Sequence, residues 1–201
     1  MEKLVQHLKA VGVLKTPALI NAFLKVDRKD FVLPEYQDQA YEDYPLPIGS
    51  GQTISQPYTV AFMLELLQPK EGEKILDIGS GSGWTTALLS HIAGKEGKVV
   101  GVELVPQLVK LGNENLVKYP FLHASIHQAK KRVLGLPNEA PFDRILVSAT
   151  SLDIPQELLE QLKEHGVMVL PVKDTVLRIQ KIPGKKPEVQ EFEGFVFVPL
   201  L

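Results

Sequence analysis

The chain has 201 residues, 44% hydrophobic and 23% charged, a composition that can fill a core and excludes wholesale disorder. Its 22 basic and 24 acidic residues leave a net charge of −2, so no whole-chain charge signal points to nucleic acid or an anionic membrane. The absence of cysteine excludes disulfides and thiolate-bound metals. Because the chain shows no signal-peptide pattern and no apolar run near the ~20 residues of a membrane span, we expect a soluble, cytoplasmic protein. We also expect it to be a monomer.

Residues 1–40 are predicted to be helical, because apolar residues recur there three and four positions apart. Thr16 and Pro17 fit the start of a second helix, with the threonine as cap and the proline in the first turn. Residues 41–57 are rich in proline and glycine and predict a long loop, which compact domains usually keep for function. Residues 58–68 predict another helix.

From Lys74 onward, predicted strands and helices alternate. The expected strands are Lys74–Ile78, Lys98–Leu104, Ala124–Ala129, Arg144–Ala149, Val167–Val172, Val176–Ile182 and Gln190–Val198. The expected helices are Trp84–Ala93, Pro106–Lys118 and Pro155–Glu164, the last ending before Gly166. This alternation predicts an α/β fold with a Rossmann-like, doubly wound, mostly parallel sheet, an N-terminal helical cap and a C-terminal antiparallel hairpin.

A glycine-rich turn, Gly79-Ser80-Gly81-Ser82-Gly83, follows the first predicted strand and leads into the next helix. Glycines let the backbone turn sharply and approach a ligand, which in open α/β sheets binds at the carboxyl ends of the strands. Glu103 lies 20 residues after Gly83, at the end of the second strand. A carboxylate there can accept hydrogen bonds from two ribose hydroxyls.

The spacing of this turn favours one nucleotide cofactor over another. A dinucleotide-binding turn reads G-x-G-x-x-G, whereas this turn reads G-x-G-x-G with Asp77 two residues before it. S-adenosylmethionine fits better, because it has no phosphate and its amino-acid end needs polar partners such as Asp77. A dinucleotide, or a tight turn that binds nothing, is the alternative.

Several further blocks stand in a recognisable order along nearly the whole chain. The most specific is Leu46-Pro47-Ile48-Gly49-Ser50-Gly51-Gln52-Thr53-Ile54-Ser55-Gln56-Pro57. The supporting blocks are Asp27–Val32, Ile75–Gly83, Ala140–Asp143 and Phe197–Leu200. Together they resemble the protein-L-isoaspartate (D-aspartate) O-methyltransferase family.

The resemblance implies a single domain, with residues 1–57 as helical cap and substrate loop and residues 58–201 as the methyltransferase core. It implies S-adenosyl-L-methionine-dependent methylation of the carboxylate of L-isoaspartyl residues in damaged proteins and peptides, which initiates their repair. The cofactor-binding residues expected from the turn and the resemblance are Gln52, Thr53, Ile54, Asp77, Gly79, Ser80, Gly81, Gly83, Glu103 and Leu104.

Ser55 is the expected catalytic residue, because the resemblance implies that its hydroxyl orients the incoming carboxylate. The alternative is that Ser55 caps the helix that follows Pro57. No general base is required, since a carboxylate with a reference pKa near ~4 is already ionised at pH 7. No metal is expected, because the five histidines lack ligand spacing. Trp84 is expected either to cover the methionine end of the cofactor or to pack on a helix face.

Two positions depart from the family pattern. After its third strand the family usually has Gly-Asp-Gly, whose acid meets the adenine amino group, and counting back from Asp143 this chain has Lys130-Lys131-Arg132 there. A cation cannot accept that hydrogen bond. A register shifted by one or two residues would bring Ala129 or Gln128 to the site, and a backbone carbonyl could accept the bond whatever the side chain. Leu201 stands where the family usually has threonine. The alternatives are therefore an altered acceptor, or a homologue that binds cofactor or peptide with weak or no turnover.

Overall fold

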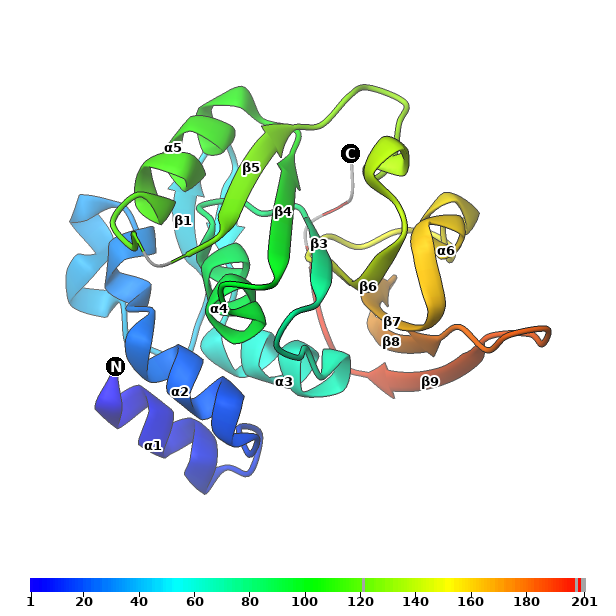
Figure 1. Cartoon of the computed structure of the whole chain (residues 1–201). Coiled ribbons are helices and arrows are strands. Elements are labelled where there is room, and N and C mark those ends of the chain that lie inside the picture. The colour runs from blue at the N-terminus through cyan, green and yellow to red at the C-terminus, as the bar shows by residue number, and fades with distance from the viewer. Residues whose placement is uncertain (121, 198, 200–201) are drawn as a thin grey trace.

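A computed structural model describes residues 1–120, 122–197 and 199 (Figure 1). The α-helices are α1 (Glu2–Ala10), α2 (Pro17–Lys25), α3 (Pro57–Leu67), α4 (Trp84–Ala93), α5 (Pro106–Leu116) and α6 (Gln156–Gln161). The 3-10 helices are η1 (Arg28–Phe31), η2 (Pro34–Gln39) and η3 (Pro137–Glu139). The strands are β1 (Leu46–Gly49), β2 (Gln52–Ile54), β3 (Lys74–Ile78), β4 (Lys98–Glu103), β5 (Ala124–Gln128), β6 (Phe142–Val147), β7 (Leu162–Val172), β8 (Thr175–Gln180) and β9 (Glu188–Glu193).

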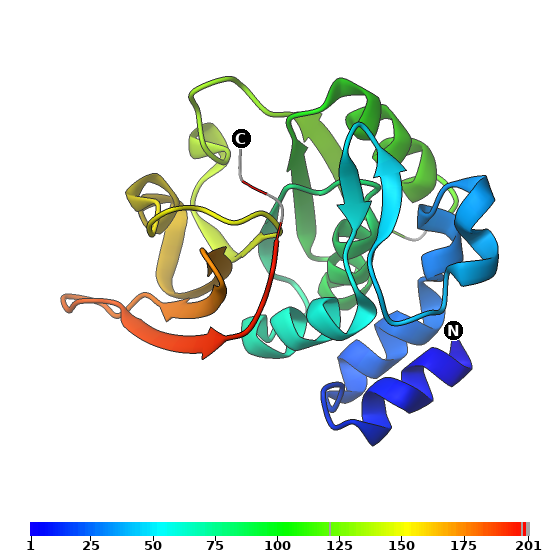
Figure 2. The same cartoon turned by 180° about the vertical axis from the view of Figure 1, so that it is seen from behind.

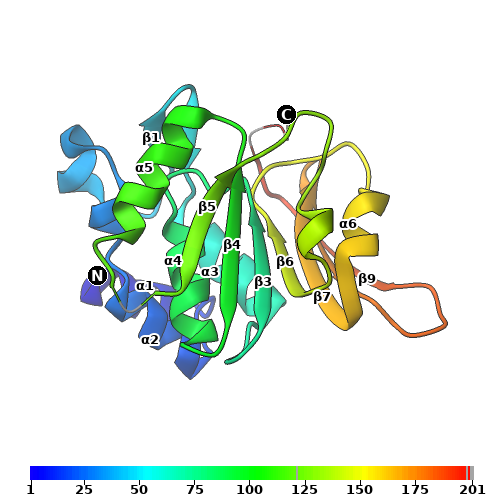
Figure 3. The same cartoon turned by 45° about the horizontal axis from the view of Figure 1, so that its top comes forward.

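Within these described ranges, strands β3 to β9 form one sheet in the order β5-β4-β3-β6-β7-β8-β9. The pairs from β5 to β7 are parallel, and β8 and β9 close the sheet as antiparallel strands. Figure 3 shows β5, β4, β3 and β6 side by side. The predicted mostly parallel sheet with a closing hairpin is thus confirmed, and the chain changes direction across the sheet between β3 and β6, where such folds bind ligands.

Alternating side chains along the central strands pack into two apolar cores on opposite faces of the sheet. On β3, Ile75 packs into one core and Leu76 into the other, as expected for a strand buried on both faces. The first core receives Leu64 of α3 and Leu88 of α4, whereas the second receives Leu158 of α6. The sheet is therefore covered by helices on both faces, which is the doubly wound arrangement predicted.

Helices α1 and α2 form the amino-terminal cap and pack outside α3 and α4 (Figure 1). Phe23 of α2 meets Trp84 of α4 edge to face, with ring centroids 5.4 Å apart. Thr16 is the N-cap residue of α2, as predicted, but its hydroxyl donates to a Glu65 carboxylate oxygen at 2.7 Å instead of capping the helix. The cap is thus joined to α3 by both apolar and polar contacts.

The prediction of a loop over residues 41–57 is wrong in its centre, where β1 and β2 form an antiparallel hairpin. Its turn is Gly49-Ser50-Gly51, with φ of 94°, 52° and 73°, so glycine supplies most of the left-handed backbone. Leu46 and Ile48 are buried in the core, while Pro47 between them is exposed. Figure 2 shows this hairpin in cyan. Its apolar side chains pack into the first core, together with those of α4.

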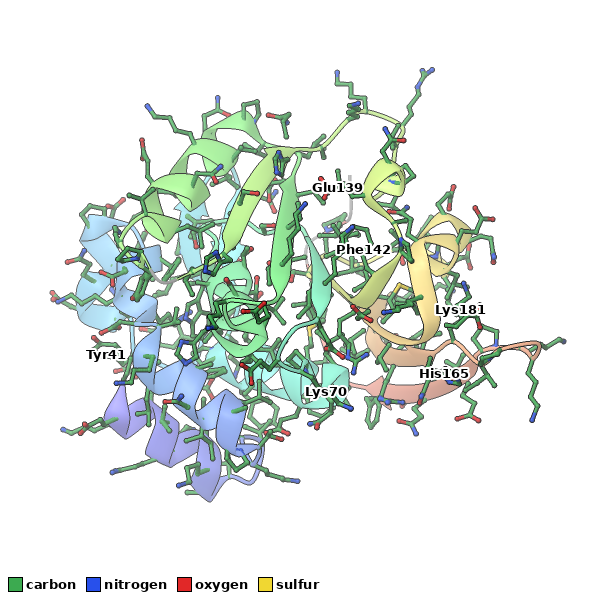
Figure 4. The ribbon with its side chains drawn as sticks, in the orientation of Figure 1. Tyr41, Lys70, Glu139, Phe142, His165 and Lys181 are labelled. Carbon is green, nitrogen blue, oxygen red and sulfur yellow. The ribbon has the colours of Figure 1, made fainter. Side chains whose placement is uncertain are left out.

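The predicted helix Pro155–Glu164 is wrong at its end, because α6 stops at Gln161 and β7 begins at Leu162. Leu162 pairs with Phe142 of β6, and Gly166, predicted as a helix stop, lies within β7. The His165 amide donates a hydrogen bond to the Lys181 carbonyl at 3.0 Å. Figure 4 shows both residues on the side of the molecule opposite to Tyr41, which lies in the cap region. The predicted last strand, Gln190–Val198, is wrong at its end, because β9 stops at Glu193; Val198 itself lies outside the described residues. None of the described helices is long and apolar enough to cross a bilayer.

Candidate functional site

A cavity of about 1100 Å³ opens at the carboxyl ends of the central strands. Its lining includes Gly81 after β3, Glu103 at the end of β4, Gln128 at the end of β5 and Ser148 after β6. This position is the topological switch point of the sheet. The volume is at the upper end of that of small-molecule sites, so it can hold a nucleoside-sized ligand together with part of a second molecule.

Most of the predicted site residues meet at this cavity. Those that line it are Gln52, Thr53, Ile54, Ser55, Gly79, Ser80, Gly81, Glu103 and Leu104. Asp77 and Gly83 lie behind the lining. Gly83 precedes α4 with φ of 92°, and a Cβ atom there would lie 3.2 Å from the Gly112 carbonyl oxygen and from the Ile126 side chain. Gly83 therefore allows α4 to pack against α5 and β5.

Gly81 is the point at which the glycine turn meets the β1–β2 hairpin. Its φ is 52°, and a Cβ atom built on it would lie 3.0 Å from Ile48 Cδ1 on the hairpin. Any side chain would both strain the backbone and push the hairpin away. Glycine at this position lets two segments that are far apart in sequence wall the same cavity.

Glu103 is an 8% exposed carboxylate fixed by the backbone on both of its oxygens. Oε2 accepts from the Gly81 amide and Oε1 accepts from the Val105 amide, each at 2.9 Å. A carboxylate has about four acceptor positions, so roughly two are left for a ligand. Glu103 is thus a rigid acceptor at the cavity wall, placed as the sequence predicts for a ribose.

Asp77 is fully buried one layer behind the cavity. Its Oδ2 accepts from the hydroxyls of Thr85 and Thr86 at 2.7 and 2.6 Å, and its Oδ1 has no hydrogen-bond partner among the described residues. Burial raises the pKa of Asp77 to about 6, with the charge of Glu103 raising it further and the two threonine bonds lowering it. Of these groups Thr85 lines the cavity, so Asp77 acts on the site through the first turn of α4.

Ser55 follows β2, is half-buried and lines the cavity. The alternative that it caps α3 is wrong, because Gln56 is the N-cap residue and the Tyr58 amide donates to Asp43 Oδ1 at 2.8 Å. Its own carbonyl accepts a hydrogen bond from Arg28 at 3.1 Å. The hydroxyl of Ser55 is therefore not needed to start the helix.

The Lys130-Lys131-Arg132 segment also lines the cavity, as an exposed rim after β5. Arg132 has φ of 64°, a conformation that favours glycine, at the place where the family pattern has its second glycine. This agrees with the ungapped register that puts Lys131 at the acidic position. Gln128 beside the rim donates its side-chain amide to the Leu104 carbonyl, which leaves its Oε1 as an acceptor.

Several lining residues were not predicted from sequence. They include Ser148, Ala149, Glu157, Glu160, Gln161 and Pro199. Trp84, for which the sequence left two roles open, both lines the cavity and is buried against Phe23 of α2. Gln161 is 3% exposed and holds the rim segment, since its Nε2 donates to the Leu134 carbonyl at 2.8 Å and its Oε1 accepts from the Leu136 amide at 2.7 Å. Ser148 could have been found, because it follows β6 at the carboxyl edge of the sheet. No feature of the sequence marks Gln161 as a residue of the site.

The fold and this site define a methyltransferase of the Rossmann-like class: a switch-point cavity walled by a glycine turn and by an acid at the end of the next strand. The sequence profile of the protein-L-isoaspartate (D-aspartate) O-methyltransferase family matches residues 1–201, and the chain belongs to that family. Leu201, which departs from the family pattern, lies outside the described residues.

Individual relatives agree with this assignment. The protein-L-isoaspartate O-methyltransferase of Methanopyrus kandleri is 41% identical over 207 residues, covering 100% of this chain and 90% of its own length. That of Myxococcus xanthus is 42% identical over 194 residues, covering 93% of this chain and 90% of its own. A Plasmodium falciparum protein assigned to the same family, solved in complex with S-adenosyl-L-homocysteine, superposes with a TM-score of 0.87 at 27% identity over 99% of this chain and 97% of its own.

Proposed function

We propose that the chain transfers a methyl group from S-adenosyl-L-methionine to the free carboxylate of L-isoaspartyl residues in damaged proteins and peptides, the first step of their repair. One observation carries this proposal. Ser55 at the end of the hairpin and Glu103 at the end of β4 line the same cavity, so a peptide carboxylate and a cofactor can meet there. The Plasmodium relative, solved with S-adenosyl-L-homocysteine, supports the choice of cofactor.

The residues present fit this cofactor. Glu103 keeps free acceptor positions for ribose hydroxyls while two backbone amides hold it in place. Thr85, oriented by Asp77, gives the cavity a polar group at the start of α4, where an amino-acid end is expected. When bound, the cofactor supplies an electrophilic sulfonium methyl group. Lys131 replaces the acid expected at the adenine end, and Gln128 Oε1 is the substitute acceptor that we propose.

The protein has little acid–base work to do in this reaction. The nucleophile is a carboxylate that is ionised at pH 7, so its two oxygens need alignment and not deprotonation. Ser55 lines the cavity next to the hairpin and is placed to donate its hydroxyl to one carboxylate oxygen. The hairpin lies against the glycine turn at Gly81, and we propose that it helps to exclude water from the reacting groups.

A methyl-transfer assay tests this function. Purified protein is incubated with methyl-labelled S-adenosylmethionine and either an isoaspartyl peptide or its aspartyl twin. We expect base-labile label on the isoaspartyl peptide alone. Equal labelling of both peptides would point to a different acceptor, and labelling of neither would contradict the proposal.

A binding protein without turnover is the second candidate, and the cationic rim favours it, because Lys131 removes an acceptor for the adenine amino group. Titration calorimetry with S-adenosylhomocysteine separates the two candidates. Binding without label transfer would support the second, whereas binding with transfer to the isoaspartyl peptide supports the first.

We also propose that the chain acts as a monomer in the cytoplasm and binds neither nucleic acid nor membranes. The net charge of −2 and the lack of cysteine support this. Light scattering at micromolar concentration checks the mass, with 22.3 kDa expected for the monomer.

A further inference from the structure

Arg28 is a fully buried cation that lies outside the predicted site. It belongs to η1, and its guanidinium donates four hydrogen bonds to backbone carbonyls. Nη1 donates to Ala40 at 2.9 Å and to Glu42 at 3.2 Å, and Nη2 donates to Tyr44 at 3.0 Å and to Ser55 at 3.1 Å. All four acceptors belong to the segment that leads into or out of the β1–β2 hairpin. The side chain is therefore dedicated to that segment.

The two hydrogen bonds of Nη2 reach residues on either side of the β1–β2 hairpin. Tyr44 and Ser55 flank the hairpin, whose strands span Leu46–Gly49 and Gln52–Ile54. A single nitrogen thus holds both ends of the hairpin at its base. Because the second of these bonds goes to the Ser55 carbonyl, Arg28 fixes the backbone of a residue that lines the cavity.

The same guanidinium also contacts the other wall of the cavity. Its Cζ lies 5.5 Å from the centroid of the Trp84 ring, and Trp84 is the first residue of α4, directly after the glycine turn. A planar cation over an aromatic face is attractive. Arg28 therefore connects the base of the hairpin to the start of the helix that carries Thr85.

Burying the charged guanidinium of Arg28 is costly unless hydrogen bonds compensate for the lost water. Removing a guanidinium from water is unfavourable, and no described carboxylate lies within 4 Å of Arg28. Burial lowers the pKa of Arg28 to about 10, and the nearby charge of Asp43 raises it, so the group stays charged at pH 7. A flat fork with five donors fits four carbonyls in two segments, which an ammonium cannot do.

We propose that Arg28 is a positioning residue for methyl transfer, holding the backbone of Ser55 in register with the glycine turn through Tyr44, Ser55 and Trp84. The role rests on the proposed function, because Ser55 matters only if a carboxylate is oriented there. A positional error of about 1 Å at a reacting group can cost on the order of 100-fold in rate.

The test compares conservative variants of two buried arginines. Arg28→Lys keeps the charge but loses the fork. Arg144→Lys is the matched control, since Arg144 is 7% exposed, pairs with Glu73 at 2.9 Å and donates to the Gln68 carbonyl, away from the hairpin. Folded sites are counted by the stoichiometry of S-adenosylhomocysteine binding, and kcat and KM for the isoaspartyl peptide are measured per folded site.

We expect Arg28→Lys to lower kcat by on the order of 100-fold while the Kd for S-adenosylhomocysteine changes only a few-fold. Arg144→Lys should lower stability and leave kcat per folded site at the wild-type value. In Arg28→Ala, which leaves space for the missing group, ethylguanidinium should restore turnover and ethylammonium should not. Wild-type kcat per folded site in Arg28→Lys would overturn the positioning role.

A second measurement tests the structural role of Arg28 even if the proposed function is wrong. If the wild type transfers no methyl group to the isoaspartyl peptide, that function is wrong, and hydrogen exchange decides the structural part of the inference. Arg28→Lys should then speed exchange of amides in Leu46–Ile54, whereas Arg144→Lys should not. Unchanged exchange there would overturn the assignment of Arg28 to the hairpin.

Discussion

The cavity has a buried negative charge on its inner wall and exposed positive charges on its outer rim. On the inner wall, Glu103 is 8% exposed and both carboxylate oxygens are fixed by backbone amides. On the outer rim, Lys130, Lys131 and Arg132 are exposed. A charge in a low-dielectric wall interacts strongly and is costly to misplace, whereas water screens an exposed charge. We therefore propose that the inner wall sets ligand recognition, whereas the charge of the exposed rim can change sign with little effect on the stability of the fold.

The largest expected effect comes from removing the inner carboxylate. Glu103→Ala deprives the ribose hydroxyls and two backbone amides of their acceptor, so affinity for S-adenosylhomocysteine should fall by ~1–3 kcal/mol, up to roughly 100-fold. Titration calorimetry measures this loss. Glu114→Ala, an exposed charge on α5, is the matched control and should bind as wild type does. Equal affinity in Glu103→Ala and wild type would remove Glu103 from the site.

The next effect is on stability and depends on pH. Since the pKa of Asp77 is raised to about 6 in the folded protein, from ~3.9 in an unfolded chain, folding takes up a proton between these values. Its contribution to stability is present below about pH 4 and is lost as pH rises through 6.

Asp77→Asn abolishes this titration and keeps an oxygen that accepts from the threonines. Its free energy of unfolding relative to wild type should therefore increase by on the order of 2 kcal/mol between about pH 4 and about pH 7.5. Urea unfolding at both pH values gives this difference. A constant offset between the two proteins would mean that Asp77 titrates normally.

A smaller effect is expected at the hairpin. Ser55→Ala should lower kcat on the isoaspartyl peptide about tenfold, the size of one net hydrogen bond of ~1.4 kcal/mol. The melting temperature should not change, because Asp43 and not Ser55 accepts from the first turn of α3. Ser50→Ala at the exposed hairpin turn is the control. A lower melting temperature with unchanged activity per folded molecule would make Ser55 a structural residue.

The smallest effect is expected at the rim. Lys131→Asp restores an acceptor for the adenine amino group, but the position is exposed, so S-adenosylhomocysteine should bind only a few-fold tighter, by ~0.5–1 kcal/mol. Lys130→Asp makes the same change of charge at the neighbouring residue and should give no gain. If Lys131→Asp weakens binding, the adenine is recognised elsewhere.

The sequence predicts best those elements whose signals are local. Strand β3 and helix α4 begin and end at the predicted residues, because an apolar run, a glycine turn and a second glycine at position 94 mark their limits. The glycine turn and Glu103 were predicted for the same reason, since the carboxyl ends of parallel strands share an edge.

The sequence predicts poorly whatever depends on distant partners. Strands β1 and β2 have four and three residues, too few for alternation to stand out from the surrounding prolines. Leu162 became the start of a strand because Phe142, 20 residues earlier, pairs with it. Arg28 would ordinarily be assigned to the surface, and only the four carbonyls gathered by the tertiary fold explain its burial.

The single nitrogen that joins Tyr44 to Ser55 has a consequence for how this protein can vary. A loop whose ends are tied together can change length at its far end without moving its base, and a doubling of loop length costs only about 0.6 kcal/mol in closure entropy. Ser50, exposed at the hairpin turn, is therefore a site for insertion, where extra residues can extend the surface offered to a passing polypeptide. Because its base is fixed and its turn is exposed, the hairpin is suited to the grafting of new recognition sequences at the turn.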